Sequence, residues 1–487
     1  MSVNKIYRPT PSSEKKVTRI GYRSSKSRRR RNIAIGIGLS FVSLISAAAG
    51  ALLAVTLSES AFLQQAKLTA EEEQVFSQEK TVAKQNIAIP ELSRPVNILV
   101  LGIKVLTSDL DEEELMNEDL GYHALVNSFE GLSDTMLLVR FDPQEEKLSV
   151  LSIPRDTKVD LDGYGNRKIN HANDYGGPAL TASAVSELLG GVEIDRYVRV
   201  NVQGIEKLID ALGGVNVFVP KDMKYNDFSQ HLYIDLKKGQ QHLDGEKAVQ
   251  FLRYRYDDLG DISRVQRQQV LMRALVEQAL KPGTIVKIPK ILDVIKSHLD
   301  TNLTVKELMA LSNFASQTER SDMQMMMLPG NFNSPEENVS YWVPDSDRIQ
   351  NLMVQHFELL TEDYSSLRER DFMNTQIAIQ NSLEDPTAAN QMLTALQEAG
   401  YHSAYISRDW AEPLRVTKIV AQKGDTISAR ALQTTLGVGE VLVESTGSLE
   451  SDITIQVGED WQNYLAVDEL EIDEIDRDTP LEEAPSW

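Results

Sequence analysis

Apolar and polar residues recur along the chain in two regular ways, at the spacing of strands and at the spacing of helices. Between residues 90 and 365 the two patterns alternate, which is typical of one α/β domain. Its predicted strands are Val96–Ile103, Thr135–Asp142, Lys147–Ile153, Arg196–Asn201, Val215–Val219, Met323–Leu328 and Tyr341–Val343. Its predicted helices are Pro178–Leu189, Val202–Leu212, Asp244–Leu252, Ser263–Leu280, Ile288–His298, Val305–Ser316 and Arg348–Leu360.

A second, smaller unit follows a charged linker over Thr361–Asp371. The pattern over residues 372–460 predicts a small α+β or α/β module. Residues 461–487 are strongly acidic, with nine acids and one arginine between Asp468 and Glu483, and they are predicted to form a disordered tail. The predicted strands of the module are Gln376–Gln380, Tyr405–Ser407, Lys418–Ala421 and Ile453–Val457, and its predicted helices are Pro386–Ala399 and Ala429–Leu436.

An uncharged apolar run of 25 residues, Ile33–Leu57, precedes both units. Because that length spans a bilayer as one helix, residues 32–58 are predicted to be a single membrane anchor, with a buried core helix as the alternative. Residues 1–31 carry eleven Lys/Arg against one acid, so the positive-inside rule places this arm in the cytoplasm. Residues 59–89 are predicted to be a stalk. The bulk of the chain is then expected outside an inner or plasma membrane, on the periplasmic side.

The net charge of the chain is −22, and the residues after the basic arm carry −32. Nucleic-acid binding needs a basic surface, so no nucleic-acid partner is expected for this acidic part. The chain has no cysteine, which excludes disulfides and thiolate metal sites. The sequence also lacks the patterns of hydrolase triads, HExxH zinc proteases and nucleotide-binding loops.

Arginines concentrate in one stretch, Phe251–Gln269, which holds four of them with three acids and three glutamines. The guanidinium group is a rigid fork of donors that matches phosphate oxygens two at a time. Arg253 and Arg255 lie two residues apart, so on an extended strand they would point to the same face. Arg264 and Gln268 lie on one face in the first turns of the next helix, where free N–H groups attract anions. The stretch therefore predicts a pyrophosphate grip, with a solvated charged segment as the alternative.

Further polar residues lie at the ends of predicted strands. Asp134 comes just before one strand, and Arg155 and Asp156 come just after another. Ligands of open α/β sheets bind beyond the C-terminal ends of the strands, so these side chains are candidates for a site. Each has a structural alternative, Asp134 as a cap and Asp156 as a surface partner of Arg155. His171, in the polar segment that follows, is interpreted as a structural histidine.

Together these motifs resemble the LytR-CpsA-Psr family, whose members are envelope phosphotransferases anchored by one N-terminal helix. The resemblance covers residues 96–280 in register, and residues 376–461 more weakly resemble the small C-terminal module often appended in that family. The fold that it implies is a central mixed β-sheet flanked by helices, with a small C-terminal α/β module. The matching segments are NILVLGI, SDTMLLV, LSIPRDT, KINHANDYGG, LIDALGGVNVFVP, GQQHLDGEKAVQFLRYRY and GDISRVQRQQ.

The resemblance implies that the chain transfers a phosphoglycosyl chain from a polyprenyl-pyrophosphate carrier to a cell-wall hydroxyl. Mg²⁺ is the implied cofactor, and the lipid is implied to lie in an apolar tunnel. In that family pattern Asp134 matches a metal-binding acid, whereas Asp156 and Asp261 match acids that orient arginines or act as a base. Arg264 is a further candidate catalytic residue. The residues that match pyrophosphate contacts are Arg155, Arg253, Arg255, Arg264 and Gln268.

One position departs from the family pattern. The first strand of the family usually ends in LG-x-D, whereas this chain has Lys104 where the second metal-site Asp is expected. A lysine ammonium replaces part of the charge of Mg²⁺ but cannot ligate the metal. Asp109 lies five residues further on and is the candidate replacement ligand. We therefore expect a weaker dependence on Mg²⁺ than in other members of the family.

Three functions are open on this basis. The first is the glycopolymer phosphotransferase, whose partners are a lipid-linked glycan, a wall acceptor and the membrane. The second is a non-catalytic protein that holds polyprenyl phosphates or wall polymer, which Lys104 favours. The third is a membrane-linked transcriptional regulator or attenuator, against which the acidic body argues. The apolar runs Ile285–Leu299 and Leu308–Phe314 are candidates for the tunnel wall, with ordinary core packing as the alternative.

Overall fold

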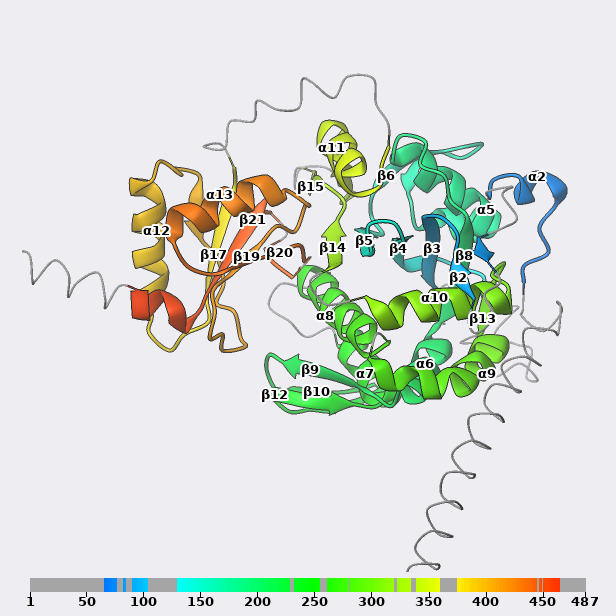
Figure 1. The fold of residues 1–487 in the computed structure, drawn as a ribbon, viewed down its shortest axis with the longest axis horizontal. Helices are drawn as coiled ribbons and strands as arrows, with labels where there is room; N and C mark the ends of the chain where they lie inside the picture. The colour runs from blue at the N-terminus through cyan, green and yellow to red at the C-terminus, as the bar shows by residue number, and fades with distance from the viewer. Residues whose placement is uncertain are drawn as a thin grey trace, which may run out of the picture. The chain divides into compact units, whose positions relative to one another are not determined.

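In those parts of the chain that the computed structural model describes (Figure 1), no helix is long and apolar enough to cross a membrane. The predicted basic arm, the predicted anchor over residues 32–58 and the acidic segment Asp468–Glu483 lie outside these parts. The described residues are 65–76, 82–84, 90–103, 129–227, 232–254, 261–279, 281–318, 322–333, 339–359, 375–444, 446–448 and 450–464.

The larger domain is built on a sheet of six described strands. In chain order they are β3 (Val96–Ile103), β4 (Ser133–Asp142), β5 (Lys147–Ile153), β8 (Arg196–Asn201), β13 (Leu299–Thr301) and β14 (Met323–Met327). Their order in space is β13-β8-β3-β4-β5-β14. β3 pairs in parallel with β8, and β5 with β14, whereas β4 runs antiparallel to both of its neighbours. The predicted central mixed sheet is therefore confirmed.

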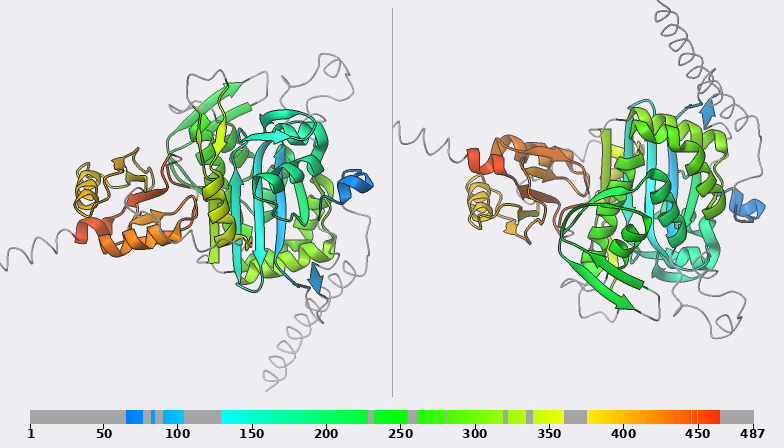
Figure 2. Two further views of the ribbon diagram at one scale, coloured as in Figure 1. Left: turned by 90° about the horizontal axis from the view of Figure 1, so that it is seen from above. Right: turned by 90° about the horizontal axis from the view of Figure 1, so that it is seen from below.

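Helices cover both faces of this sheet (Figure 2). They include α5 (His171–Leu188), α8 (Asp261–Ala279), α10 (Val305–Gln317) and α11 (Ser346–His356). Leu99 of β3 lies in one core with Val185 of α5 and Leu352 of α11. Ile98, its neighbour on β3, packs with Ala310 of α10 in a second core on the opposite face. Successive strand residues point to opposite faces, so the continuous apolar run of β3 serves both cores.

Helix α5 begins earlier than predicted, and it contains a break. Gly176 and Gly177 have non-helical dihedral angles, and the φ of Gly177 is +61°, a conformation that favours glycine. The part after the break starts at Pro178, as predicted, because proline is well suited to the first turn of a helix. The part before it, from His171, brings a polar segment back towards the sheet.

A group of smaller elements follows β8 and precedes α8 in the sequence. It consists of α6 (Val202–Leu212), β9 (Val215–Val219), β10 (Met223–Asp227), β11 (Leu232–Leu236), β12 (Gly239–Leu243) and α7 (Gly245–Arg253). Helix α6 ends where the sequence predicts, because Gly213 adopts the left-handed conformation that closes a helix. The antiparallel pairs β9–β12 and β10–β11 share one core with α7 and α8. Of these four strands, only β9 was predicted from the sequence.

The short elements of the larger domain complete it. Residues 65–76 fall in the predicted stalk, yet the ring of Phe76 lies 5.2 Å from that of Tyr197, and the N–H of Ala66 donates to Asp300 over 2.6 Å. This part of the stretch is therefore packed on the domain. The remaining elements are α2 (Ala70–Glu73), β1 (Ala83–Lys84), β2 (Glu91–Leu92), β6 (Lys158–Leu161), β7 (Gly165–Lys168), η2 (Pro282–Lys287), α9 (Ile288–His298), β15 (Gly330–Phe332) and β16 (Trp342–Pro344).

The C-terminal module has its own five-stranded sheet in the described residues, in the order β18-β17-β21-β19-β20. Trp461 lies in the core of the module, although the prediction placed it at the start of the tail. The predicted small α/β module is confirmed, and β20 is an additional strand. Its elements are β17 (Ile377–Asn381), α12 (Ala388–Glu398), β18 (Ala404–Ile406), β19 (Lys418–Val420), α13 (Thr426–Leu436), β20 (Glu440–Leu442) and β21 (Ile453–Val457).

Candidate active site

Asp134 and Arg155 meet at one edge of the central sheet. β4 and β5 are antiparallel with Met136 opposite Ile153, and continuing that register places Asp134 opposite Arg155. The Nη1 atom of Arg155 donates to Oδ1 of Asp134 over 2.8 Å. The two side chains are 24% and 16% exposed, so a ligand in solution reaches both. The predicted strand-end residues therefore form one polar pair.

Asp156 lies between two cations. Its Oδ2 atom is 3.6 Å from Nε of Arg155, and its Oδ1 atom is 2.9 Å from Nζ of Lys168. Lys168 is the last residue of β7, and the antiparallel β6–β7 pair returns it to Asp156. Asp156 is therefore within ion-pair distance of both Arg155 and Lys168, and its role, orienting an arginine or acting as a base, stays a prediction. Lys168 was not predicted as a site residue.

Backbone hydrogen bonds fix the segment around this pair. The N–H of Asn170 donates to the carbonyl of Arg155, and the carbonyl of Asn170 accepts from the N–H of Ser133, each over 3.2 Å. The side chain of Asn173 donates to the carbonyl of Gly131 over 2.8 Å. The polar segment at the start of α5 thus joins the end of β5 to the start of β4. This bracing holds the Asp134–Arg155 pair in place.

His171 has a structural environment, in agreement with the sequence interpretation. Its ring is stacked on that of Tyr175, with the centroids 5.5 Å apart, and Tyr175 is stacked on Tyr164 at 4.5 Å. Burial lowers the pKa of His171 below its usual value, and Lys168 and Arg167 lower it further, although Asp174 raises it. The histidine is therefore neutral at pH 7.

A cavity of about 40 Å³ opens beside the Asp134–Arg155 pair, between the sheet and α8. Its lining includes three predicted site residues, Asp134, Arg155 and Gln268. All three are partly exposed, so they mark the mouth of the cavity. Gln269 also lines it; this side chain is 5% exposed, and its Oε1 atom has no hydrogen-bond partner in the described residues. The apolar lining includes Met136, Leu137, Val150, Met272, Met325, Met326 and Met327.

The candidate runs for the tunnel wall, Ile285–Leu299 and Leu308–Phe314, are not among the described residues that line this cavity. Its described lining comes from β4, β5, β14 and α8. Phe314 packs in the core cluster that also contains Met272, so ordinary core packing accounts for it. The signal that could have identified the wall is the methionine run of β14, which the sequence analysis treated only as a strand.

Arg267 is a structural member of the arginine stretch. It is 5% exposed, its Nε atom donates to the carbonyl of Phe251 over 3.1 Å, and its Nη2 atom donates to the carbonyl of Tyr254. Burial lowers the pKa of Arg267 to about 10, so the group stays charged at pH 7. These hydrogen bonds connect α8 to the end of α7, where Arg253 lies.

Two expectations about the arginine stretch are corrected. Arg253 was placed on an extended strand, but it is the last residue of α7. A helix forms because Asp244 caps it and because Ala248 and Phe251, three residues apart, are both buried. Helix α8 begins at Asp261, two residues before the cap predicted at Ser263.

The other predicted site residues are only partly located. Asp261 and Arg264 belong to the first four residues of α8. Arg255 and Asp109, together with Lys104, lie outside the described residues. Their expected contacts with pyrophosphate and metal remain predictions.

The described residues contain no group of three or more His, Cys, Asp or Glu side chains that could hold a metal ion. Asp134 contributes one carboxylate at the cavity mouth. Mg²⁺ commonly uses one or two carboxylates and takes its other ligands from water and substrate phosphates. Among the described residues, Asp134 could therefore supply one carboxylate ligand to a magnesium ion.

The sequence model of the LytR_cpsA_psr family matches residues 60–358, which is more than half of the chain. The chain belongs to the LytR-CpsA-Psr family. A second model, described as LytR cell envelope-related transcriptional attenuator, matches residues 374–461. The two matches correspond to the α/β domain and the C-terminal module, so the resemblance drawn from the motifs is confirmed for both units of this LytR-CpsA-Psr protein.

Curated relatives within the LytR-CpsA-Psr family carry two kinds of name. The polyisoprenyl-teichoic acid–peptidoglycan teichoic acid transferase TagV of Bacillus subtilis is 32% identical over 238 residues, which are 47% of this chain and 60% of TagV. A transferase with the same description, TagU of Oceanobacillus iheyensis, is 33% identical over 54% of this chain and 76% of TagU. The regulatory protein MsrR of Staphylococcus aureus is 35% identical over 35% of this chain and 51% of MsrR. The alignments thus span 60% of TagV and about half of MsrR.

Solved structures of the family are also similar. The crystal structure of B. subtilis TagV is 28% identical to this chain, and the match covers 55% of this chain and 99% of that one, with a TM-score of 0.45.

Proposed function

We propose that this protein is a glycopolymer phosphotransferase that moves a chain from a polyprenyl-pyrophosphate carrier to a hydroxyl group of the cell wall or envelope. The observation that carries the proposal is the Asp134–Arg155 pair at the mouth of a cavity with an apolar lining. A lipid diphosphate needs both parts, fixed donors for the phosphates and apolar surface for the tail. The names of TagV and TagU, which describe such transferases, support it.

In this proposal the diphosphate lies at the cavity mouth. Arg155 donates to its oxygens, and Gln268 offers amide donors from α8 on the other side. Arg253, Arg255 and Arg264 are proposed to add further positive charge. The prenyl chain enters the apolar part of the cavity. Phosphoryl transfer depends chiefly on positioning and charge neutralisation, which this set of donors provides.

The cavity must widen to admit the prenyl chain, because about 40 Å³ holds little more than one water molecule. Met136, Met272 and the methionines of β14 line it. Methionine side chains are unbranched and change rotamer readily, so they adapt to an irregular ligand. The methionine-rich lining therefore lets side chains move aside while the strands and helix stay in place.

The proposed reaction forms one phosphorus–oxygen bond and breaks another. The oxygen of the acceptor hydroxyl attacks the phosphorus that bears the sugar, and the bond from that phosphorus to the bridging oxygen breaks. The products are a phosphodiester-linked glycopolymer and prenyl phosphate. The hydroxyl proton passes to a base, for which Asp156 is the proposed group because Lys168 and Arg155 orient it. Asp261 is the alternative base.

Mg²⁺ is the proposed cofactor, held by Asp134 and by Asp109, and it would neutralise charge on the diphosphate. Because Lys104 replaces an expected acid, we predict that activity falls only several-fold, rather than being abolished, when Mg²⁺ is removed with a chelator. The measurement is transfer rate against Mg²⁺ concentration for the intact protein and for Asp109→Ala. If the intact protein shows a full, saturable requirement for Mg²⁺ and Asp109→Ala abolishes it, Asp109 is a metal ligand. If the same Mg²⁺ requirement survives in Asp109→Ala, the proposed metal site is contradicted.

The proposed location follows from the sequence. Residues 32–58 would anchor the protein as a single-pass membrane protein, with residues 1–31 in the cytoplasm and the domains outside. In this topology the larger domain can reach both the carrier lipid in the membrane and the acceptor in the cell wall. A fusion reporter at residue 487 that scores as cytoplasmic would contradict this topology.

The proposal is tested with the purified intact protein, a lipid-linked glycan diphosphate and a wall glycan acceptor. We expect transfer of labelled glycan to the acceptor, and near-complete loss of transfer in Arg253→Ala and in Arg255→Ala. Arg430→Ala, which removes an exposed arginine from α13, is the matched control and should retain full activity. Carrier binding without transfer in the intact protein would replace the proposal with the non-catalytic binding function.

A further inference from the structure

The C-terminal module supplies hydrogen-bond acceptors to the edge of the central sheet. β14 is the last strand of that sheet, and its other side is paired with β5. The N–H of Met325 donates to the carbonyl of Val443 over 2.7 Å, and the N–H of Met327 donates to the carbonyl of Gln422 over 2.9 Å. Unpaired N–H groups on an edge strand otherwise need water or another chain. The module therefore continues the hydrogen bonding of the strand that lines the cavity.

The module also contacts α8. Nη1 of Arg273 lies 2.7 Å from Oε2 of Glu444, and the two side chains are 17% and 10% exposed. Glu444 follows Val443, so one short segment of the module contacts both β14 and α8. Arg273 follows Met272, which lines the cavity, and lies about one helical turn beyond Gln268 and Gln269. A charge-assisted hydrogen bond at such a half-buried position holds the helix more firmly than a neutral one.

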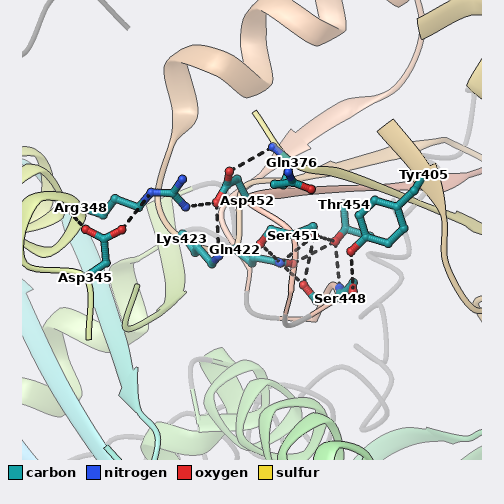
Figure 3. A network of polar contacts seen from close by, with 10 residues as sticks. All are labelled: Asp345, Arg348, Gln376, Tyr405, Gln422, Lys423, Ser448, Ser451, Asp452 and Thr454. Atoms are coloured by element: carbon teal, nitrogen blue, oxygen red, sulfur yellow. Dashed lines mark hydrogen bonds and ion pairs between the residues drawn. The ribbon is translucent and has the colours of Figure 1, made fainter. Parts of the chain in front are cut away.

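A third contact involves α11 and is drawn in Figure 3. Arg348 of α11 forms an ion pair with Asp452 of the module, whose Oδ1 atom also lies 3.2 Å from Nζ of Lys423. His356, at the end of α11, lies with its Nε2 atom 3.0 Å from the carbonyl of Gly424, and its Nδ1 atom contacts Gln324 of β14 over 2.8 Å. The contacts to β14, α8 and α11 together form a three-point attachment.

Two of these three elements, β14 and α8, are walls of the candidate active site, together with β4 and β5. β14 contributes three methionines to the cavity lining, and α8 contributes Gln268, Gln269 and Met272. The module contacts both β14 and α8, so it acts on the site through these two elements. Fixing both walls reduces the conformational freedom that a bound carrier would otherwise have to restrict.

We infer that the C-terminal module is a working part of the carrier site, and that Glu444 is a positioning residue that fixes α8 against β14. The inference rests on the proposed function, since it assumes that the cavity receives the carrier. It assigns the module a role inside the molecule. With the attachment intact, the methionine side chains adapt to the prenyl chain while their backbones stay in register. When the attachment loosens, the phosphate donors on α8 and the sheet lose their common geometry.

The test is the Glu444→Gln variant, which removes the charge and keeps the shape of the side chain. We expect the KM for the lipid-linked donor to rise about tenfold, because carrier binding depends on the spacing between α8 and β14. Glu440→Gln, an exposed glutamate on β20 of the same module, is the matched control and should keep the original KM. Arg273→Gln should reproduce the effect from the other side, and the double variant should be no worse than either single one.

Amide hydrogen exchange gives a second readout that needs no turnover. In Glu444→Gln, the amides of Met325 and Met327 and those of α8 should exchange faster than in the intact protein, and in Glu440→Gln they should not. If the intact protein transfers glycan and Glu444→Gln retains its donor KM, the inference is overturned while the proposed function stands. If the intact protein shows no transfer, the exchange result decides alone, and unchanged exchange at β14 and α8 overturns the inference.

Discussion

Replacing Arg155 with alanine is expected to lower transfer from the lipid-linked donor by about 10³-fold, the size of effect seen when a fixed cation is removed from a phosphoryl-transfer site. The guanidinium group of Arg155 lies between two carboxylates, with Nη1 2.8 Å from Oδ1 of Asp134 and Nε 3.6 Å from Oδ2 of Asp156. Arg155 also lines the cavity. Steady-state kinetics with labelled donor measure the loss, which should fall mainly on kcat/KM.

A further variant separates the geometry of the guanidinium group from its charge. Arg155→Lys keeps the positive charge and loses the fork, so we expect it to recover part of the activity but not most of it. Arg430→Ala serves again as a control for loss of a surface arginine. An Arg155→Ala protein that folds normally and retains more than half of its activity would remove Arg155 from the site.

Replacing Asp300 with alanine is expected to lower the free energy of unfolding of the larger domain by about 3–5 kcal/mol, because it leaves a buried cation without its counter-charge. Asp300 is 2% exposed, and its Oδ2 atom accepts from Nε of Arg199 over 2.5 Å. Tyr197 donates to Oδ1 over 3.3 Å, and burial together with Asp300 raises the pKa of the tyrosine. Arg199 also donates to Asn173, so the network links β8 and β13 to the segment that braces the active site. The measurement is urea-induced unfolding.

The matched control for that prediction is Asp235→Ala. Asp235 lies on β11 with its side chain 67% exposed, at 3.9 Å from Lys237, and exposed pairs of this kind contribute at most about 1 kcal/mol. The double variant Asp300→Ala with Arg199→Met should recover part of the lost stability, since it removes both charges. Equal destabilisation by Asp300→Ala and Asp235→Ala would contradict the assignment of a buried charge network.

Most of the sheet could be predicted from the sequence, because β3, β4, β5 and β14 contain apolar runs, whereas the three-residue β13 was not predicted. β3, β5 and β8 begin and end at the predicted residues, and β9 does as well. The short pairs escaped prediction for a physical reason: β7 reads GNRK, is almost wholly exposed, and has no apolar alternation. Such a strand is specified by its pairing with β6 rather than by its own pattern.

The candidate site was predictable to the extent that strand ends and motifs specify it. Asp134 and Arg155 meet because an antiparallel register places them opposite one another. Lys168 reaches Asp156 only through the β6–β7 pair, so its role depends on a hairpin that was not foreseen. Arg253 was assigned to a strand on the spacing of two arginines, whereas the predicted helix that Asp244 caps continues one residue beyond Leu252 and includes Arg253. The contact of Glu444 with Arg273 joins residues 171 positions apart, and neither local pattern indicates it.

The central claim is that the cavity beside Asp134 and Arg155 holds the diphosphate and the lipid of a glycan carrier. The most direct measurement is a crystal structure of the protein with a polyprenyl diphosphate bound. The account predicts diphosphate density within hydrogen-bonding distance of Arg155 and Gln268, with the prenyl chain running between the sheet and α8 against the methionines of β14. A diphosphate bound elsewhere on the domain, with this cavity still closed around its methionines, would contradict it.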